Sequence, residues 1–125
     1  MRTFREAILL AAQRIEDTSA AFRFEAIYTP DPDDPRAEGC AMGWITAYLG
    51  CGGAYYQAGY LMDLPPDERW DPIHTFYDRL DTICTSLYGY KSKHSWMLVS
   101  LVCAQCLRMY ADTYYPEVVE VRKAA

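Results

Sequence analysis

Positive charge is scarce in this sequence, and the shortage limits what the chain can bind. The 125 residues include 12 Lys and Arg against 17 Asp and Glu, so the formal net charge is −5. Proteins that bind nucleic acid directly need a basic face for the phosphates, and we therefore expect no direct contact with nucleic acid. Glycine and proline number seven each, too few for a collagen-like or low-complexity chain.

Long apolar runs are also missing. The longest uncharged stretch, Gly39–Met62, has the length of a membrane span, but it holds six of the seven glycines. The charged N-terminus lacks the apolar region and the cleavage site of a secretory signal. Five cysteines, an odd number, are typical of reduced thiols. We therefore expect a cytoplasmic protein that makes no membrane contact.

Motifs that carry chemistry are few. Cys103 and Cys106 form a CxxC, but zinc needs four ligands and this pair lies in the most apolar predicted helix. The acidic stretch 31–38 does not fit a calcium loop, because a proline stands where the fifth position needs an acid. The two histidines, His74 and His94, have no ordered nucleophile or oxyanion site that the sequence reveals. We predict no catalytic residue, no metal site and no cofactor.

Apolar residues recur at helical spacing along much of the sequence, and residues that favour helix starts and stops flank these segments. A capping box at Thr3 opens the first expected helix, and Asp34 with Pro35 predicts the cap and first residue of the second. Gly50 and Gly89 are expected to end two helices in the left-handed conformation. The expected helices are 4–18, 35–49, 54–61, 72–88 and 93–114.

The last of these helices is apolar nearly all round in its first half, which is typical of the central helix of a bundle. We predict an all-α protein, a single domain over 1–125. It is expected to be a compact bundle of about five helices around the central helix 93–114. The side chains of residues 22–29 alternate in character with the period of a strand. A short strand pair near these residues is therefore an alternative.

Negative charge is concentrated in the middle of the chain. Residues 25–81 hold eleven acids and three bases, a net of −8, whereas the segments before and after carry +1 and +2. Acids that gather in space would speed association with a basic surface, and their effect would weaken as salt rises. The alternative is an ordinary solvated face that serves solubility.

Tyrosine is the second feature that stands out, with 11 residues. Three tyrosines near the glycine-rich segment lie outside any predicted core stripe, and tyrosine is favoured at protein interfaces. Tyrosines wedged between helices are the alternative. The expected partner-binding residues are Asp31, Asp33, Asp34, Glu38, Tyr55, Tyr56, Tyr60, Asp63, Asp67, Glu68 and Asp71.

Together these features predict a small acidic inhibitor that occupies a basic surface of a partner protein, with aromatic residues for affinity and carboxylates for rate and orientation. In size, charge and lack of enzyme motifs, the chain resembles the small phage-encoded antagonists of bacterial defence, anti-CRISPR proteins among them. That resemblance implies a viral protein whose carboxylates occupy the nucleic-acid-binding surface of a processing complex. An immunity or antitoxin protein, a small enzyme, and a structural homodimer or larger homo-oligomer are the alternatives.

Overall fold

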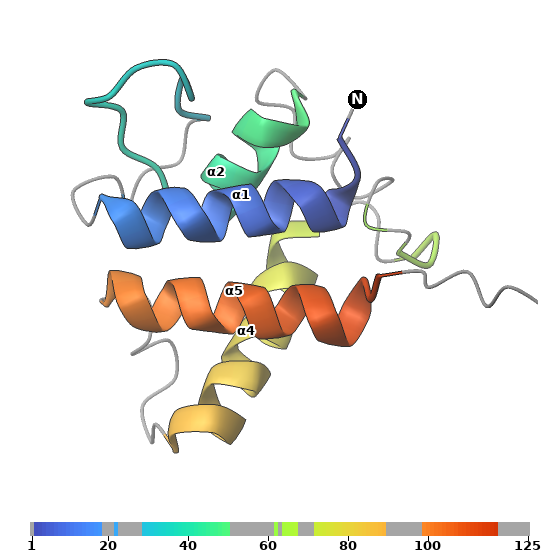
Figure 1. Cartoon of the computed structure of the whole chain (residues 1–125). Helices are drawn as coiled ribbons and strands as arrows, with labels where there is room; N and C mark the ends of the chain where they lie inside the picture. Colours follow the sequence, from blue (N-terminus) through green and yellow to red (C-terminus); the bar gives the residue numbers. More distant parts are fainter. Residues whose placement is uncertain are drawn as a thin grey trace, which may run out of the picture.

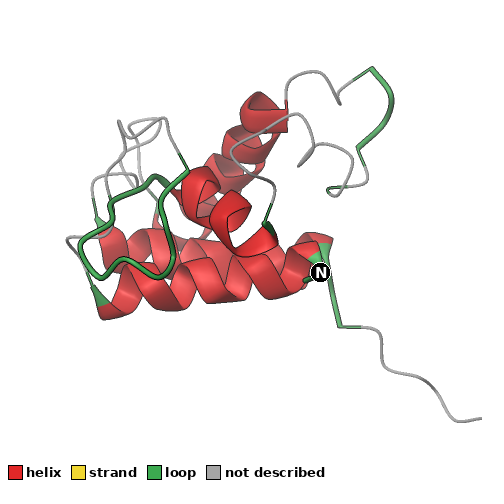
Figure 2. Cartoon of the chain, turned by 90° about the horizontal axis from the view of Figure 1, so that it is seen from above, coloured by secondary structure: helices red, strands yellow, loops and turns green. Residues whose placement is uncertain are grey.

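The computed structural model describes residues 2–18, 22, 29–50, 62, 64–67, 72–89 and 99–117. Within these residues it contains four helices and no strand (Figures 1 and 2): α1 (Phe4–Asp17), α2 (Ala41–Leu49), α4 (Pro72–Tyr88) and α5 (Ser100–Tyr114). The predicted all-α class is confirmed for this part of the chain. The helix expected over 54–61 lies outside it, so the expected count of about five is not confirmed.

The centre of the fold is a pair of helices. Figure 1 shows α1 and α5 lying side by side and antiparallel, while α4 crosses α5. In addition to this pairing, α1 packs against α2 and α5 packs against α4. The bundle is therefore not built around 93–114 alone, because α1 has as many helical neighbours as α5.

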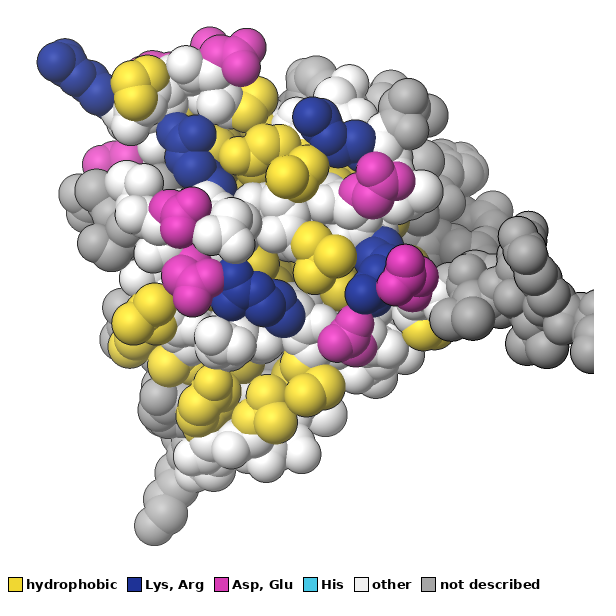
Figure 3. Space-filling model, in the orientation of Figure 1, with side chains coloured by type: hydrophobic (Ala, Val, Ile, Leu, Met, Phe, Trp, Pro, Cys, Tyr) yellow, Lys and Arg dark blue, Asp and Glu magenta, His cyan; other side chains and the backbone are white. Residues whose placement is uncertain are grey.

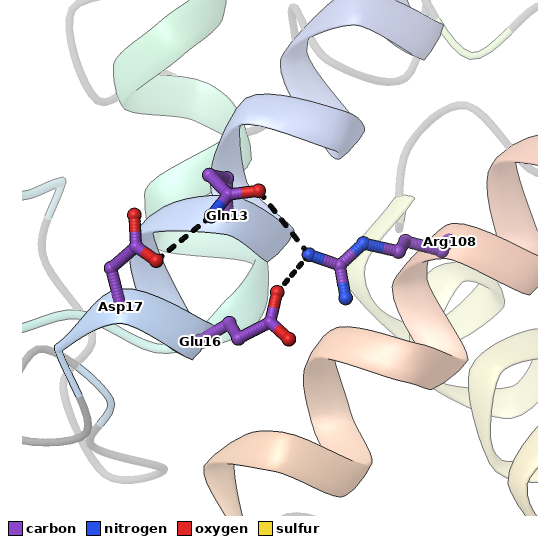
Figure 4. Close-up of polar contacts among 4 residues, drawn as sticks. All are labelled: Gln13, Glu16, Asp17 and Arg108. Carbon is purple, nitrogen blue, oxygen red and sulfur yellow. Dashed lines mark hydrogen bonds and ion pairs between the residues drawn. The ribbon is translucent and has the colours of Figure 1, made fainter.

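Polar contacts join the two central helices along their outer side. Arg108 of α5 binds Glu16 of α1, and its Nη2 lies 3.5 Å from Oε1 of Gln13 (Figure 4). Nearer the other end of the pair, Nη1 of Arg5 lies 3.0 Å from a carboxylate oxygen of Asp112. Figure 3 shows both signs of charge interspersed over this face, as these pairs require.

Large side chains from all four helices fill the space between them. Trp44, Tyr110, Phe76 and Ile8 are among the largest fully buried side chains and belong to one hydrophobic core. The rings of Phe76 and Tyr110 meet edge to face with centroids 5.2 Å apart, which joins α4 to α5.

The first turn of α5 is less buried than its apolar sequence suggested. Leu101 is 57% exposed and Val99, just before the helix, is 44% exposed. Among the described helices, α5 packs mainly against α1 and α4, and apolar residues of its first turn stay in contact with solvent. Leu87 and Tyr88 at the end of α4 are similarly exposed. The expectation that this helix is buried all round is therefore wrong at its start.

Most of the local signals at helix ends predicted the structure correctly. The Thr3 hydroxyl accepts from the Glu6 amide while the Glu6 carboxylate accepts from the Thr3 amide, which is the predicted capping box. Helix α4 has the predicted bounds, and α1 ends one residue before the predicted 18. Gly50 and Gly89 have φ angles of 76° and 65°, the left-handed conformation that ends a helix.

The start of the second helix was predicted wrongly. Helix α2 begins at Ala41 with Cys40 as its N-cap, not at Pro35. The Asp34 carboxylate does accept a backbone hydrogen bond, from the Arg36 amide at 2.9 Å, but in a turn rather than at a helix start. A tight packing contact of Gly39 then fixes the chain before α2 can begin.

Of the segment 22–29, for which a strand was the alternative, the structure describes only residues 22 and 29. Phe22 makes an isolated parallel bridge with Gly39, and no strand is present in the described part of the chain. Residues 23–28 lie outside that part. Among the described helices, none is both long and apolar enough to cross a bilayer.

Candidate functional site

Residues 29–39, which we call the acidic loop, hold four of the expected partner-binding acids. The loop lies beside the C-terminal end of α1 (teal in Figure 1). Arg14 of α1 anchors it by donating to two backbone carbonyls, Pro32 O at 3.1 Å and Asp34 O at 2.8 Å. The Arg14 guanidinium also lies 4.6 Å from the centroid of the Trp44 ring on α2. One arginine therefore ties the loop to both α1 and α2.

Carboxylates within the acidic loop order its backbone. Asp31 Oδ1 accepts from the Asp33 amide at 2.9 Å, and Asp34 Oδ1 accepts from the Arg36 amide at the same distance. Such side-chain to backbone bonds are typical of aspartate in turns. Each uses one oxygen of its carboxylate, and the three aspartates Asp31, Asp33 and Asp34 all remain exposed.

The ends of the acidic loop are fixed by packing on α2. Gly39 lies so close to Pro30 that an added Cβ would stand 2.8 Å from the proline Cγ, and 3.2 Å from Nε1 of Trp44. At the other end of the loop, the hydroxyls of Thr29 and Thr46 are 3.1 Å apart and hydrogen-bonded. The loop is therefore closed at its base and anchored near its middle.

Within the described residues, positive charge does not cancel that of Asp31, Asp33 and Asp34. Arg14 directs its donors at carbonyl oxygens, and Asp33 has no ion pair or side-chain hydrogen bond within the part of the chain described. Counting Arg14 and the exposed Arg36 against the four acids of the loop, the local charge is about −2. The loop therefore presents negative charge on a fixed backbone.

The structure places the expected residues unevenly. It brings Asp31, Asp33 and Asp34 together as exposed side chains, with Glu38 half-buried nearby. The segment 64–67, which carries the exposed Asp67, lies at the opposite end of the molecule in both Figure 1 and Figure 2. Tyr55, Tyr56, Tyr60, Asp63, Glu68 and Asp71 lie outside the described residues.

The described cysteines and His74 do not gather into a metal-binding group. No group of three His, Cys, Asp or Glu that could hold a metal occurs among the residues described. Cys103 and Cys106 both lie in the core, and burial raises the pKa of each thiol. His74 is exposed and pairs with Asp78 one turn along α4, at 3.0 Å.

Two residues that organise the acidic loop were not singled out from the sequence. Arg14 contributes to the charge of the first segment, and Trp44 falls within the helix expected over 35–49, but the sequence pointed to no role for either. Their roles depend on contacts across 18 to 30 positions of sequence, from Arg14 to Pro32 and to Trp44. The one local hint was a basic residue in the last turn of α1, where cations are stabilised by the helix dipole.

No protein-family model, curated protein or solved structure matches this chain.

Proposed function

We propose that this chain is a binding protein that sets its acidic loop against a basic surface of a partner protein. The observation that supports this most is the way Arg14 holds the loop. Because it bonds backbone carbonyls rather than carboxylates, the loop is anchored while Asp31, Asp33 and Asp34 stay exposed.

An ordered loop has an advantage in binding. A flexible acidic segment would lose conformational entropy when a partner fixes it, whereas a loop already held by side-chain and backbone bonds loses less. Asp31 and Asp34 each keep one carboxylate oxygen for a partner after ordering the loop. Arginine donors on a basic surface could bind these oxygens with charge-assisted bonds.

Closely spaced carboxylates can also occupy sites meant for phosphates. In that form of the proposal, the partner is a nucleic-acid-processing protein and the chain acts as its inhibitor, in the manner of a phage antagonist of bacterial defence. The negative field of the loop would raise the association rate at low salt. The loop supports this by gathering three acids within four residues of sequence.

A titration with a nine-residue arginine peptide tests the loop as the binding surface. The test variant is Asp31→Asn/Asp33→Asn/Asp34→Asn, because asparagine keeps the Oδ1 acceptor that orders the loop and removes only its charge. The matched control, Asp17→Asn/Asp67→Asn/Glu117→Gln, removes the same charge at exposed positions elsewhere. Two-dimensional NMR spectra report both the site and the dissociation constant.

We expect the loop variant to bind the peptide at least about fivefold more weakly than the control variant at low salt. The amide signals that move in the wild type should be those of the acidic loop. Equal weakening in both variants would show that total charge rather than the loop attracts the peptide, and would contradict the proposal.

A further inference from the structure

A second candidate site lies on the other side of the core, where α4 and α5 meet. A cavity of about 250 Å³ is lined by Met62, Arg79, Tyr114 and Tyr115. It is close to the lower end of the volumes that ligand clefts occupy, roughly 300 Å³. We propose that this cavity binds a small carboxylic acid with a single ring, whose carboxylate is held by Arg79. The acidic loop has no part in this inference.

Arg79 is the cation of the cavity. Its guanidinium stacks over the Tyr114 ring at 4.7 Å from the centroid, and the stack fixes the plane of its donors. Within the described residues it has no carboxylate at ion-pair distance. A stacked arginine without a carboxylate partner is suited to a planar, bidentate anion.

Tyr110 lies beside Arg79 in the core. Its side chain is fully buried and is not among the residues that line the cavity. Burial raises the pKa of its hydroxyl, and the nearby Arg79 partly opposes the rise. Tyr110 is therefore a positioning residue for the Arg79 guanidinium rather than a contact of the ligand.

The walls of the cavity limit the rest of the ligand. Tyr114 and Tyr115 supply aromatic surface and Met62 an adaptable apolar side chain. The Tyr115 hydroxyl is already engaged, since it donates to Met62 O at 2.9 Å. Among the described lining residues Arg79 is the one cation, and a single guanidinium suits a monoanion better than a phosphate dianion.

Benzoate is the probe that matches this description, with benzamide as its neutral counterpart and inorganic phosphate as the alternative anion. With nine non-hydrogen atoms in an open cavity, benzoate should bind with a dissociation constant on the order of 1 mM. NMR titration of the full chain measures it. Benzamide and phosphate should each bind about tenfold more weakly or not at all. No saturable binding of benzoate, or phosphate binding as tight, would overturn the proposal.

Variants test the residues in turn. Arg79→Gln should weaken benzoate binding about tenfold or more, whereas Arg36→Gln, the same charge change at an exposed loop position, should leave it unchanged. Tyr110→Phe should weaken benzoate binding a few-fold, less than Arg79→Gln does, because its hydroxyl neighbours Arg79 without lining the cavity. Equal affinity in Arg79→Gln and Arg36→Gln would overturn the role of Arg79. Unchanged affinity in Tyr110→Phe would overturn that of Tyr110.

Discussion

Replacing Arg14 by glutamine is the sharpest test of how the acidic loop is held. The side chain donates to two loop carbonyls and stacks on Trp44. At this half-buried position the two hydrogen bonds contribute about 1 kcal/mol each. The cation–π contact contributes about 0.5–1 kcal/mol. We therefore expect Arg14→Gln to lower the free energy of unfolding by about 2–3 kcal/mol.

Urea denaturation followed by circular dichroism measures this change directly. Arg36→Gln is the matched control, because Arg36 is exposed in the same loop and its side chain makes no hydrogen bond to the described part of the chain. This variant should stay within about 0.5 kcal/mol of the wild type. Arg14→Lys keeps the positive charge but lacks the planar guanidinium that donates to both carbonyls. It should therefore restore less than half of the free energy of unfolding that Arg14→Gln loses. Equal stability of the Arg14→Gln and Arg36→Gln variants would refute the anchoring role.

Three further predictions concern the helix pair, the base of the loop and the buried thiols. Arg108→Gln should lower the free energy of unfolding by about 1 kcal/mol, because it removes the ion pair with Glu16. A double-mutant cycle with Glu16→Gln should give a coupling energy of about 0.5–1 kcal/mol. A coupling energy of zero would contradict the contact in Figure 4. Gly39→Ala should destabilise by about 1–3 kcal/mol in thermal melts, because the new Cβ would stand 2.8 Å from a rigid proline ring; an unchanged melting temperature would contradict that approach. Burial raises the pKa of Cys103 and Cys106, so the folded state holds these thiol protons more tightly than the unfolded chain. Above about pH 8.5 the unfolded chain loses the protons and the folded state keeps them, so the free energy of unfolding should fall as pH rises. Urea melts from pH 7 to 10 check this, and a Cys103→Ala/Cys106→Ala variant that falls equally steeply would contradict it.

The elements that the sequence predicted well are those whose signals are local. The bounds of α4 followed from apolar spacing, a proline at the first residue and Gly89 after the last. The capping box at Thr3 is likewise complete within four residues. In both cases the residues that decide the structure touch one another along a single helix.

The elements that the sequence did not predict depend on contacts between distant segments. Helix α2 begins later than expected, and the residue before its N-cap, Gly39, lies close to Pro30 and Trp44, a contact that periodicity cannot reveal. An apolar helix start predicted burial, but Leu101 in the first turn of α5 is exposed, which depends on how the other segments pack around it. The anchoring by Arg14 is of the same kind. For the candidate site, the sequence therefore indicated the acids but not what fixes them.

Capture of the partner from a lysate of the cells in which the protein acts tests the central claim most directly. Wild type, the loop variant Asp31→Asn/Asp33→Asn/Asp34→Asn and the charge-matched control would be immobilised in equal amounts and compared by quantitative mass spectrometry. We expect a basic protein that the wild type and the control retain and the loop variant loses, with recovery that falls as salt rises. A partner retained equally by the loop variant would contradict the claim that the acidic loop is the binding surface.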